Sequence, residues 1–397
     1  MNGKLRKLRL SLASISVFRN ILSDDVISEL RELMDSAESG DTSQIIDHYG
    51  RFVHELYERN VNFSKYLLKL VTEDENIYII SQSQDNGISK AIAEAAENEL
   101  LILQELSQLT PEDIADEIGY NGYLPKWETS DIDFIEKYHR YVGDVDKHGY
   151  GKWAKSDMFI FRDGSIVPVK SHDTQKLSEL YGYDIQRNSV INNTLALING
   201  KPALNALLYG DAGTGKSSTV KAIVNEYSPM GLRLIEITKE QLRYIPEIVD
   251  EISGNPLKFI IFIDDLSFTA GEDSFGALKA TLEGSVAANA DNMVIYATSN
   301  RRHLIKETFS DREGDDVHRN DTLQETLSLS ARFGLRVNFS RPDKNSYVAI
   351  AYELAKSKGI NISEKDIALK AEQFAISSGN GRSPRTAKQF VEQLLSE

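Results

Sequence analysis

The sequence predicts an α/β protein in which a parallel sheet lies between helices, with a mainly helical region before it and a small helical bundle after it. Three observations support this fold class. Between residues 176 and 341, short apolar runs alternate with amphipathic segments, a pattern typical of parallel strands joined by helices. Residues 1–120, and those after Pro342, instead repeat their apolar side chains at helical spacing. We therefore expect three domains, over residues 1–175, 176–341 and 342–397.

Helices make up most of the expected N-terminal domain. In the segment SDDVISELRELMDSAESG, Ser23 or Asp24 can cap a helix, and Gly40 lies just past its end. Further helices are predicted over residues 45–57, 88–109 and 110–119. In the helix that begins after Ser23 or Asp24, the apolar residues recur on one face: Val26, Ile27, Leu30, Leu33 and Met34. Two extended runs flank Asp163-Gly164 and predict a β-hairpin, which we interpret as the end of this domain.

Five short apolar runs predict the strands of the parallel sheet. These runs span residues 203–210, 232–238, 258–265, 292–300 and 335–340. Helices are expected over 185–199, 216–227, 239–253 and near 273–284, and in the C-terminal bundle over 344–357, 364–378 and 384–396. Because the strands alternate with amphipathic helices, both faces of the sheet should be covered.

The bulk composition limits the classes of function. The 397 residues are enough for two or three domains, and the formal net charge of −15 disfavours nucleic acid as a partner. The chain has no cysteine, which excludes disulfides, thiolate metal sites and cysteine nucleophiles and fits a cytoplasmic location. No apolar run approaches the length of a membrane span. Four basic residues near the N-terminus precede a stretch that serines interrupt, which indicates a basic amphipathic segment more than a secretion signal.

The glycine-rich stretch GDAGTGKSS stands between a predicted strand and a predicted helix, and it matches G-x-x-x-x-G-K-[ST] at every fixed position. Its glycines let several main-chain N–H groups point at one anion, and the following helix adds its positive end. Lys216 would reach the β- and γ-phosphates of a nucleotide, and the Ser217 hydroxyl would bind Mg²⁺. A chance match is the alternative, which the flanking strand and helix disfavour. The expected nucleotide-binding residues are Gly210, Asp211, Ala212, Gly213, Thr214, Gly215, Lys216, Ser217 and Ser218.

Two carboxylates end the predicted strand FIIFIDD. Asp264 is expected to hold Mg²⁺ through its water shell, because Mg²⁺ dehydrates reluctantly. Asp265 would stand where a carboxylate can orient or deprotonate an attacking water. A strand end with two solvated carboxylates is the alternative, and the nearby phosphate-binding stretch disfavours it. No guanine-reading Asn-Lys-x-Asp is present, which favours ATP over GTP.

With these motifs in order, the sequence resembles an AAA+ ATPase of the P-loop NTPase class over roughly residues 176–397. The resemblance implies roles for three more residues. Asn300, in YATSN, matches the sensor-one polar residue that helps to place the attacking water. Arg332, in LSLSARFGL, matches the arginine finger that reaches the nucleotide of a neighbouring subunit. Arg385, in GRSPRTAKQF, is similar to the sensor-two arginine, which reaches from the helical lid to the γ-phosphate in cis.

A closer resemblance is to an uncharacterised bacterial AAA+ family known as domain of unknown function 815. Six stretches carry it: ELYGYDIQRNSVINNT, LLYGDAGTGKSS, FIIFIDDLSF, ATSNRRHLI, LSLSARFGL and GRSPRTAKQF. The resemblance implies a five-stranded parallel sheet between helices, a C-terminal helical lid, and the use of ATP with Mg²⁺. It implies no biological role, because that family has no established one.

Several of these residues also have a plainer interpretation. AAA+ proteins usually carry glutamate where Asp265 stands; aspartate is one methylene shorter, so we expect slow hydrolysis, not its absence. Arg332 and Arg385 could each be solvated surface charges, and Arg382 is a rival for the sensor-two role. The acidic segment 307–325 is more typical of a solvated insertion than of a binding loop.

The expected function is ATP hydrolysis with Mg²⁺ in a homo-oligomer, either a ring or a dimer with shared sites, since Arg332 would act in trans. The catalytic residues would be Asp265, Asn300, Arg332 and Arg385, and the N-terminal domain would couple the nucleotide state to an unknown partner, expected to be a protein. One alternative is an assembly switch that binds ATP with little turnover. A DNA-associated loader is a further alternative, disfavoured by the acidic charge and the lack of a recognisable helix-turn-helix.

Overall fold

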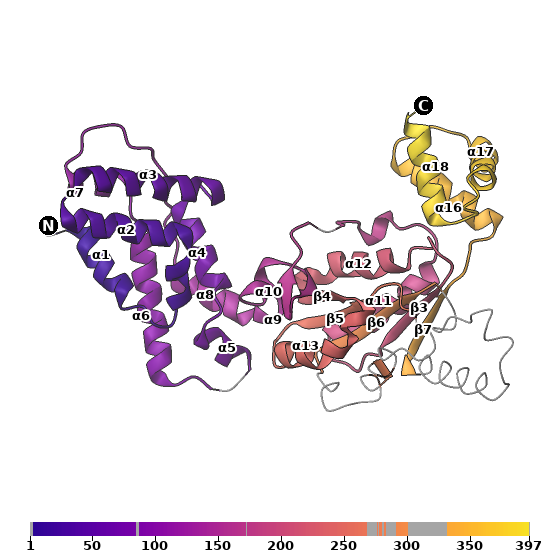
Figure 1. The fold of residues 1–397 in the computed structure, drawn as a ribbon, viewed down its shortest axis with the longest axis horizontal. Helices are drawn as coiled ribbons and strands as arrows, with labels where there is room; N and C mark the ends of the chain where they lie inside the picture. The colour runs from indigo at the N-terminus through magenta and orange to yellow at the C-terminus, as the bar shows by residue number, and fades with distance from the viewer. Residues whose placement is uncertain are drawn as a thin grey trace. The chain divides into compact units, whose positions relative to one another are not determined.

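The computed structural model describes residues 3–84, 87–171, 173–267, 276, 278–279, 282, 291–300 and 332–396. The chain divides into two compact units, Met1–Lys155 and Ser156–Glu397. The first unit is helical, and the second combines a sheet with helices (Figure 1).

The first unit is built from helices, several of which begin with a side-chain cap. They are α1 (Lys4–Ala13), α2 (Asp25–Ser39), α3 (Thr42–Arg59), α4 (Phe63–Glu73), α5 (Ile77–Ser83), α6 (Lys90–Ser107), α7 (Pro111–Ile118), α8 (Phe134–Gly143), α9 (Val145–His148) and α10 (Lys152–Lys155). The Asp24 side chain accepts hydrogen bonds from the first N–H groups of α2, and Gly40 ends that helix in the left-handed conformation, with φ at 78°. The predicted limits of this helix are therefore confirmed.

The first helix is amphipathic, as the sequence predicts. Leu5, Leu8 and Leu12 lie on its inner face and are buried in the core of this unit. Its basic residues face outward and form ion pairs: Lys4 Nζ lies 2.7 Å from a carboxylate oxygen of Asp113, and Lys7 Nζ lies 2.7 Å from one of Glu105. The Arg9 guanidinium pairs with the carboxylates of Asp35 and Glu38. This basic stretch is thus neutralised within its own unit.

One buried carboxylate fastens the loop after α1 to α6. Glu99 is only 5% exposed. Its two oxygens accept hydrogen bonds from the main-chain N–H groups of Ser16, Val17 and Phe18, at 2.8, 2.9 and 3.0 Å, and from the Ser16 hydroxyl at 2.7 Å. A buried carboxylate needs such donors to offset its lost hydration.

A seven-stranded sheet lies at the centre of the second unit, with strand order β2-β1-β4-β5-β6-β3-β7. Its strands are β1 (Met158–Arg162), β2 (Ser165–Pro168), β3 (Ala206–Gly210), β4 (Leu232–Ile237), β5 (Lys258–Ile263), β6 (Met293–Ser299) and β7 (Leu335–Phe339). Every neighbouring pair is parallel except the hairpin of β1 and β2. The five predicted parallel strands are β3 to β7, so this part of the fold prediction is confirmed.

The hairpin forms where it was expected but belongs to a different part of the chain. Asp163 and Gly164 have φ values of 51° and 77°, as a tight two-residue hairpin turn requires. However, β1 pairs in parallel with β4, so the hairpin extends the sheet and does not close the N-terminal domain. The compact units accordingly divide after Lys155, not after residue 175. Pairing between segments far apart in the sequence depends on tertiary packing, which local patterns do not report.

Helices pack on the sheet. Side chains of α11 (Asp184–Ile198) and α12 (Lys216–Tyr227) pack on one face, in a core with sheet residues such as Leu208, Phe262 and Tyr296. Figure 1 shows α12 and α13 (Ile245–Ile252) on opposite sides of the strands. The helix predicted over 239–253 begins as a 3₁₀ turn, and α13 starts at Ile245, because Pro246 favours the first turn of a helix. The helix expected near 273–284 lies mostly outside the described residues.

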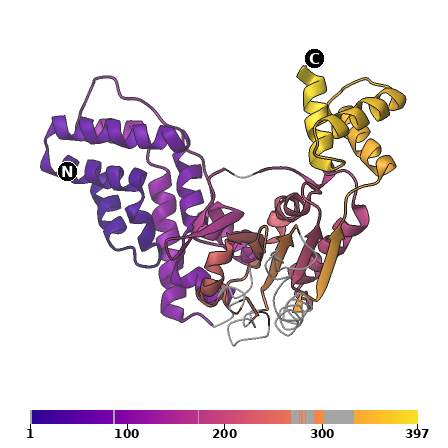
Figure 2. The same cartoon turned by 45° about the vertical axis from the view of Figure 1, so that its right-hand side comes forward.

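Three helices complete the second unit: α16 (Lys344–Ser357), α17 (Glu364–Ser377) and α18 (Pro384–Ser396). They form the C-terminal bundle, drawn in orange and yellow in Figure 2. Its core includes the buried side chains of Tyr347, Ala371 and Phe390. Among the helices that the structure describes, none combines the length and the apolar character needed to cross a bilayer.

Candidate functional site

The loop between β3 and α12 has the backbone geometry of an anion-binding nest. Gly210, Gly213 and Gly215 have φ values of 135°, 76° and 90°, which residues with a side chain rarely adopt. A Cβ at Gly210 would lie 2.3 Å from the carbonyl oxygen of Phe339 on β7. Gly215 immediately precedes α12, so the loop ends at the positive end of that helix. The glycine positions therefore serve close packing as well as the turn.

Lys216 is the buried cation of this loop. It is 6% exposed, and its Nζ donates hydrogen bonds to the carbonyl oxygens of Gly210 and Asp211, at 3.0 and 2.8 Å, and to Asn300 Oδ1 at 3.0 Å. Burial lowers the pKa of Lys216, and the nearby carboxylates of Asp265, Asp211 and Asp264 act in the opposite direction. An anion bound beside this ammonium group would therefore be favoured by charge.

One carboxylate oxygen joins the loop to two strand ends. Asp264, just after β5, accepts a hydrogen bond from the Ser217 hydroxyl at 2.5 Å and another from the Thr298 hydroxyl, on β6, at 2.6 Å. Ser217 and Asp264 thus meet as the sequence predicts. Hydroxyl and carboxylate oxygens are the hard ligands that Mg²⁺ prefers.

Asp265 adopts the left-handed backbone conformation, with φ at 52°. Its N–H group donates to Thr298 Oγ1 at 2.9 Å, which fixes this conformation. Its carboxylate accepts a hydrogen bond from Asn300 Nδ2 at 2.6 Å. Because Asn300 also accepts from Lys216, the three side chains form one connected chain: cation, amide and carboxylate.

The C-terminal bundle contributes the start of α18 to this site. The N–H of Arg385 donates to the carbonyl oxygen of Gly213 at 3.2 Å, and a Cβ at Gly213 would lie 3.2 Å from Arg385 Cβ. Arg382, the rival for the sensor-two role, instead forms a two-pronged ion pair with Glu372, with both distances at 2.8 Å. Of these two arginines, Arg385 is the one that lines the cavity of this site.

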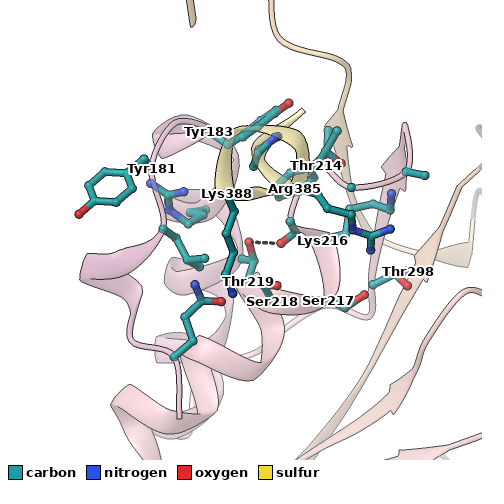
Figure 3. Close-up of a pocket in the computed structure, with 18 of the residues that line it drawn as sticks. Tyr181, Tyr183, Thr214, Lys216, Ser217, Ser218, Thr219, Thr298, Arg385 and Lys388 are labelled. Carbon is teal, nitrogen blue, oxygen red and sulfur yellow. Dashed lines mark hydrogen bonds between the residues drawn. The ribbon is translucent and has the colours of Figure 1, made fainter. Parts of the chain in front are cut away.

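A cavity of about 530 Å³ brings these groups together (Figure 3). At one side lie Ser217, Asp264, Asp265, Thr298 and Asn300. Less polar side chains also line the cavity: Leu180, Tyr181, Tyr183, Ile350 and Leu354. Its other lining residues include the charged Asp173, Glu179, Arg187 and Lys388. The Tyr183 hydroxyl donates to the carbonyl oxygen of Ser340 at 2.7 Å, which holds its ring in place. The cavity therefore has a polar end at Ser217 and Thr298 and an end with aromatic rings at Tyr181 and Tyr183 (Figure 3).

Most of the predicted site residues meet at this cavity. Ala212 to Ser218, Asp264, Asp265, Asn300 and Arg385 line it, while Gly210 and Asp211 lie behind it and hold Lys216 through their carbonyls. Arg332 is exposed and is not among the lining residues. The acidic segment 307–325 falls outside the described residues.

The sequence reasoning missed several residues that line the cavity: Thr298, Lys388, Tyr181, Tyr183 and Arg187. Two of them could have been found from their sequence spacing to a predicted site residue. Thr298 stands two residues before Asn300 on a strand end, where side chains alternate between faces. Lys388 follows Arg385 by one helical turn. The tyrosines precede α11 with no regular spacing that would assign them to a cavity.

The chain is similar to several known proteins. A family model described as "Protein of unknown function (DUF815)" matches residues 154–397. The replication factor C large subunit of Methanococcus vannielii is 22% identical over 231 residues, covering 57% of this chain and 41% of that protein. A 26S proteasome regulatory subunit 6B homolog of Dictyostelium discoideum is 24% identical over 226 residues, covering 50% of this chain and 51% of that protein.

The chain thus spans about half, or less, of the length of these two relatives. Among solved structures, the Thermotoga maritima RuvB Holliday junction branch migration motor aligns with 56% of this chain and 64% of its own, at 14% identity and a TM-score of 0.38.

Proposed function

Because this chain belongs to the family described as "Protein of unknown function (DUF815)", an AAA+ family, we propose that it binds ATP with Mg²⁺ and hydrolyses it within a homo-oligomer. The observation that carries this proposal is the connected set of Lys216, Asn300 and Asp265 beside the Ser217–Asp264 pair, all facing one cavity. A charged end suits a triphosphate, and an aromatic and aliphatic end suits a flat base.

The residues present fit Mg²⁺. Ser217 and Asp264 would hold it, since each offers an oxygen ligand and the two oxygens already meet. Within the described residues, no group of three or more His, Asp and Glu side chains forms a metal site alone, so phosphate and water oxygens would complete the shell. When bound, Mg²⁺ neutralises charge on the phosphate oxygens.

The attacking water would be oriented by Asp265 and Asn300. The water oxygen bonds to the γ-phosphorus, its proton passes to the Asp265 carboxylate, and the bond from phosphorus to the β–γ bridging oxygen breaks. ADP and inorganic phosphate result. Lys216 and Arg385 would neutralise charge on the transferred group, and exposed Arg332 would act on the cavity of a neighbouring subunit.

The test of turnover is a steady-state phosphate-release assay with Asp265→Asn. We expect the wild type to exceed this variant by about tenfold or more, as for loss of a general base. Asp250→Asn, an exposed carboxylate on α13, is the matched control and should behave like the wild type. Tight ATP binding without turnover above the Asp265→Asn level would instead support a second candidate, an ATP-dependent assembly switch. The short side chain of aspartate, which brings its carboxylate less close to the attacking water, favours this candidate.

Shared sites are tested by mixing two inactive variants. Lys216→Ala should lack ATP binding, and Arg332→Ala should bind ATP without turning it over. If Arg332 acts in trans, a mixed oligomer contains some cavities with both an intact Lys216 and an intact neighbouring arginine. Activity should then return on mixing, and its absence in mixed oligomers shown to form would contradict the trans role.

We propose a protein as the partner of the oligomer, because the net charge of −15 opposes binding to nucleic acid. Salt-sensitive binding to duplex DNA at physiological ionic strength would contradict this part of the proposal and favour a DNA-associated loader. Affinity capture with the Asp265→Asn variant, which should stay bound to ATP, is the matching search for a protein partner.

A further inference from the structure

Lys388 is a second cation that α18 presents to the cavity. It stands three residues after Arg385, so the two side chains lie on the same side of the helix. Both residues line the cavity of the candidate site. In Figure 3 the Lys388 side chain extends from α18 toward Ser218 and Thr219, at the start of α12, whereas Ser217 and Thr298 lie on the other side of Lys216.

Lys388 differs from Arg187 and Arg382 in its hydrogen bonds and ion pairs. Arg187 is paired with Asp184 at 2.6 Å, and Arg382 is paired with Glu372. Lys388 has no hydrogen bond or ion pair with any residue that the structure describes, although Asp173 and Glu179 line the same cavity. Glu179 instead accepts a hydrogen bond from the main-chain N–H of Lys176 at 2.9 Å. The charge of Lys388 therefore remains available to an anion.

The two ends of the cavity indicate which part of a nucleotide would meet this ammonium group. The Ser217–Asp264 pair marks the magnesium end, where the β- and γ-phosphates would lie, and Tyr181 and Tyr183 mark the base end. Ser218 and Thr219 follow the lysine and serine of the phosphate loop, and the α-phosphate lies between the magnesium end and the base end. Lys388 approaches the cavity at this middle position.

We propose that Lys388 is a nucleotide-positioning residue that binds the α-phosphate from the C-terminal bundle. This inference rests on the proposed function. ATP and ADP both carry an α-phosphate, so Lys388 keeps α18 in contact with the nucleotide before and after hydrolysis. Arg385, if it binds the γ-phosphate as proposed above, makes its contact only with ATP. The bundle would thus hold two cations with different nucleotide dependence on one helix turn.

The experiment measures the affinities of ATP, ADP and AMP for the full chain by calorimetry, in wild type, Lys388→Ala and Arg385→Ala. Loss of Lys388 should weaken ATP and ADP by the same factor, about tenfold for one charge-assisted hydrogen bond, and should weaken AMP as well. Loss of Arg385 should weaken ATP more than ADP. Lys388→Arg should restore most of the affinity, because it keeps the charge and the reach.

Lys370→Ala is the matched control, since it removes an exposed lysine from α17 that does not line the cavity. It should leave all three affinities unchanged. A Lys388→Ala variant that binds ATP and ADP like the wild type would overturn the proposal, and so would a loss confined to ATP, which would assign Lys388 to the γ-phosphate. If the wild type binds none of the nucleotides, the proposed function itself is wrong, so the two failures are distinguishable.

Discussion

The two units of this chain each contain a cluster built around carboxylates, and the clusters differ in what surrounds them. Glu99 in the N-terminal unit is 5% exposed and accepts its hydrogen bonds from main-chain N–H groups and one serine. Asp264 and Asp265 are exposed at a cavity and accept theirs mainly from side chains: Ser217, Thr298 and Asn300.

This difference separates a structural cluster from one that a ligand can enter. The donors of Glu99 belong to a fixed loop, so no ligand can replace them without unfolding that loop. Asp264, Asp265 and their side-chain donors line a cavity, so a bound phosphate, metal or water can reach them without unfolding a loop. Changes in one cluster should therefore affect stability, and changes in the other should affect nucleotide chemistry.

The largest effect should come from Lys216→Ala. It removes the buried ammonium group of the phosphate loop, so affinity for ATP with Mg²⁺ should fall by about a hundredfold or more, in line with the loss of a partly desolvated charge contact. Calorimetry measures this directly. Lys221→Ala, on the same helix, removes a lysine that pairs with Glu236 at 3.0 Å outside the cavity. That control should bind ATP normally, and wild-type affinity in Lys216→Ala would refute the site.

The second-largest effect should be on the free energy of unfolding alone. Glu99→Gln replaces a charged acceptor by an amide whose NH₂ group faces N–H donors, so the N-terminal unit should lose about 2 kcal/mol of unfolding free energy. Chemical denaturation measures the loss. Nucleotide affinity should stay at the wild-type value, and a matching loss of affinity would contradict the separation of the two clusters.

Thr298→Val should have a moderate effect on both properties. It leaves the N–H of Asp265 and one oxygen of Asp264 without the hydroxyl that joins them. Turnover should fall by about tenfold and stability by about 1 kcal/mol. Thr194→Val is the matched control, because this buried hydroxyl bonds to Val190 and Tyr296 away from the cavity. It should lower stability without lowering turnover per folded molecule.

Arg382→Ala should have the smallest effect. Its ion pair holds the pKa of Glu372 below the ordinary value of a glutamate. A lowered folded-state pKa gives stability that is present above the unfolded-state pKa and is lost as pH falls through the folded-state pKa. The melting temperatures of wild type and variant should therefore differ slightly at neutral pH and converge in acid. ATP affinity should change by less than about twofold, because neither residue of this pair lines the cavity.

The sequence alone predicted the elements whose evidence is local. The five parallel strands, the phosphate loop and the position of Asp264 beside Ser217 follow from short patterns with fixed spacing. The pairing of β1 with β4 was not predictable in this way, since it joins segments separated by the phosphate loop. Tyr181, Tyr183 and Lys388 were missed for a similar reason, because only the folded chain brings the segment before α11 and the turn of α18 to one cavity.

The left-handed backbone at Asp265 suits the aspartate that stands at this position. Aspartate and asparagine tolerate a φ near 52° better than most side chains. Glutamate at this position would be a less tolerant residue in the same unfavourable backbone conformation. The short side chain and the left-handed main chain at this position are therefore coupled, and a change to one would have to be matched by a change to the other.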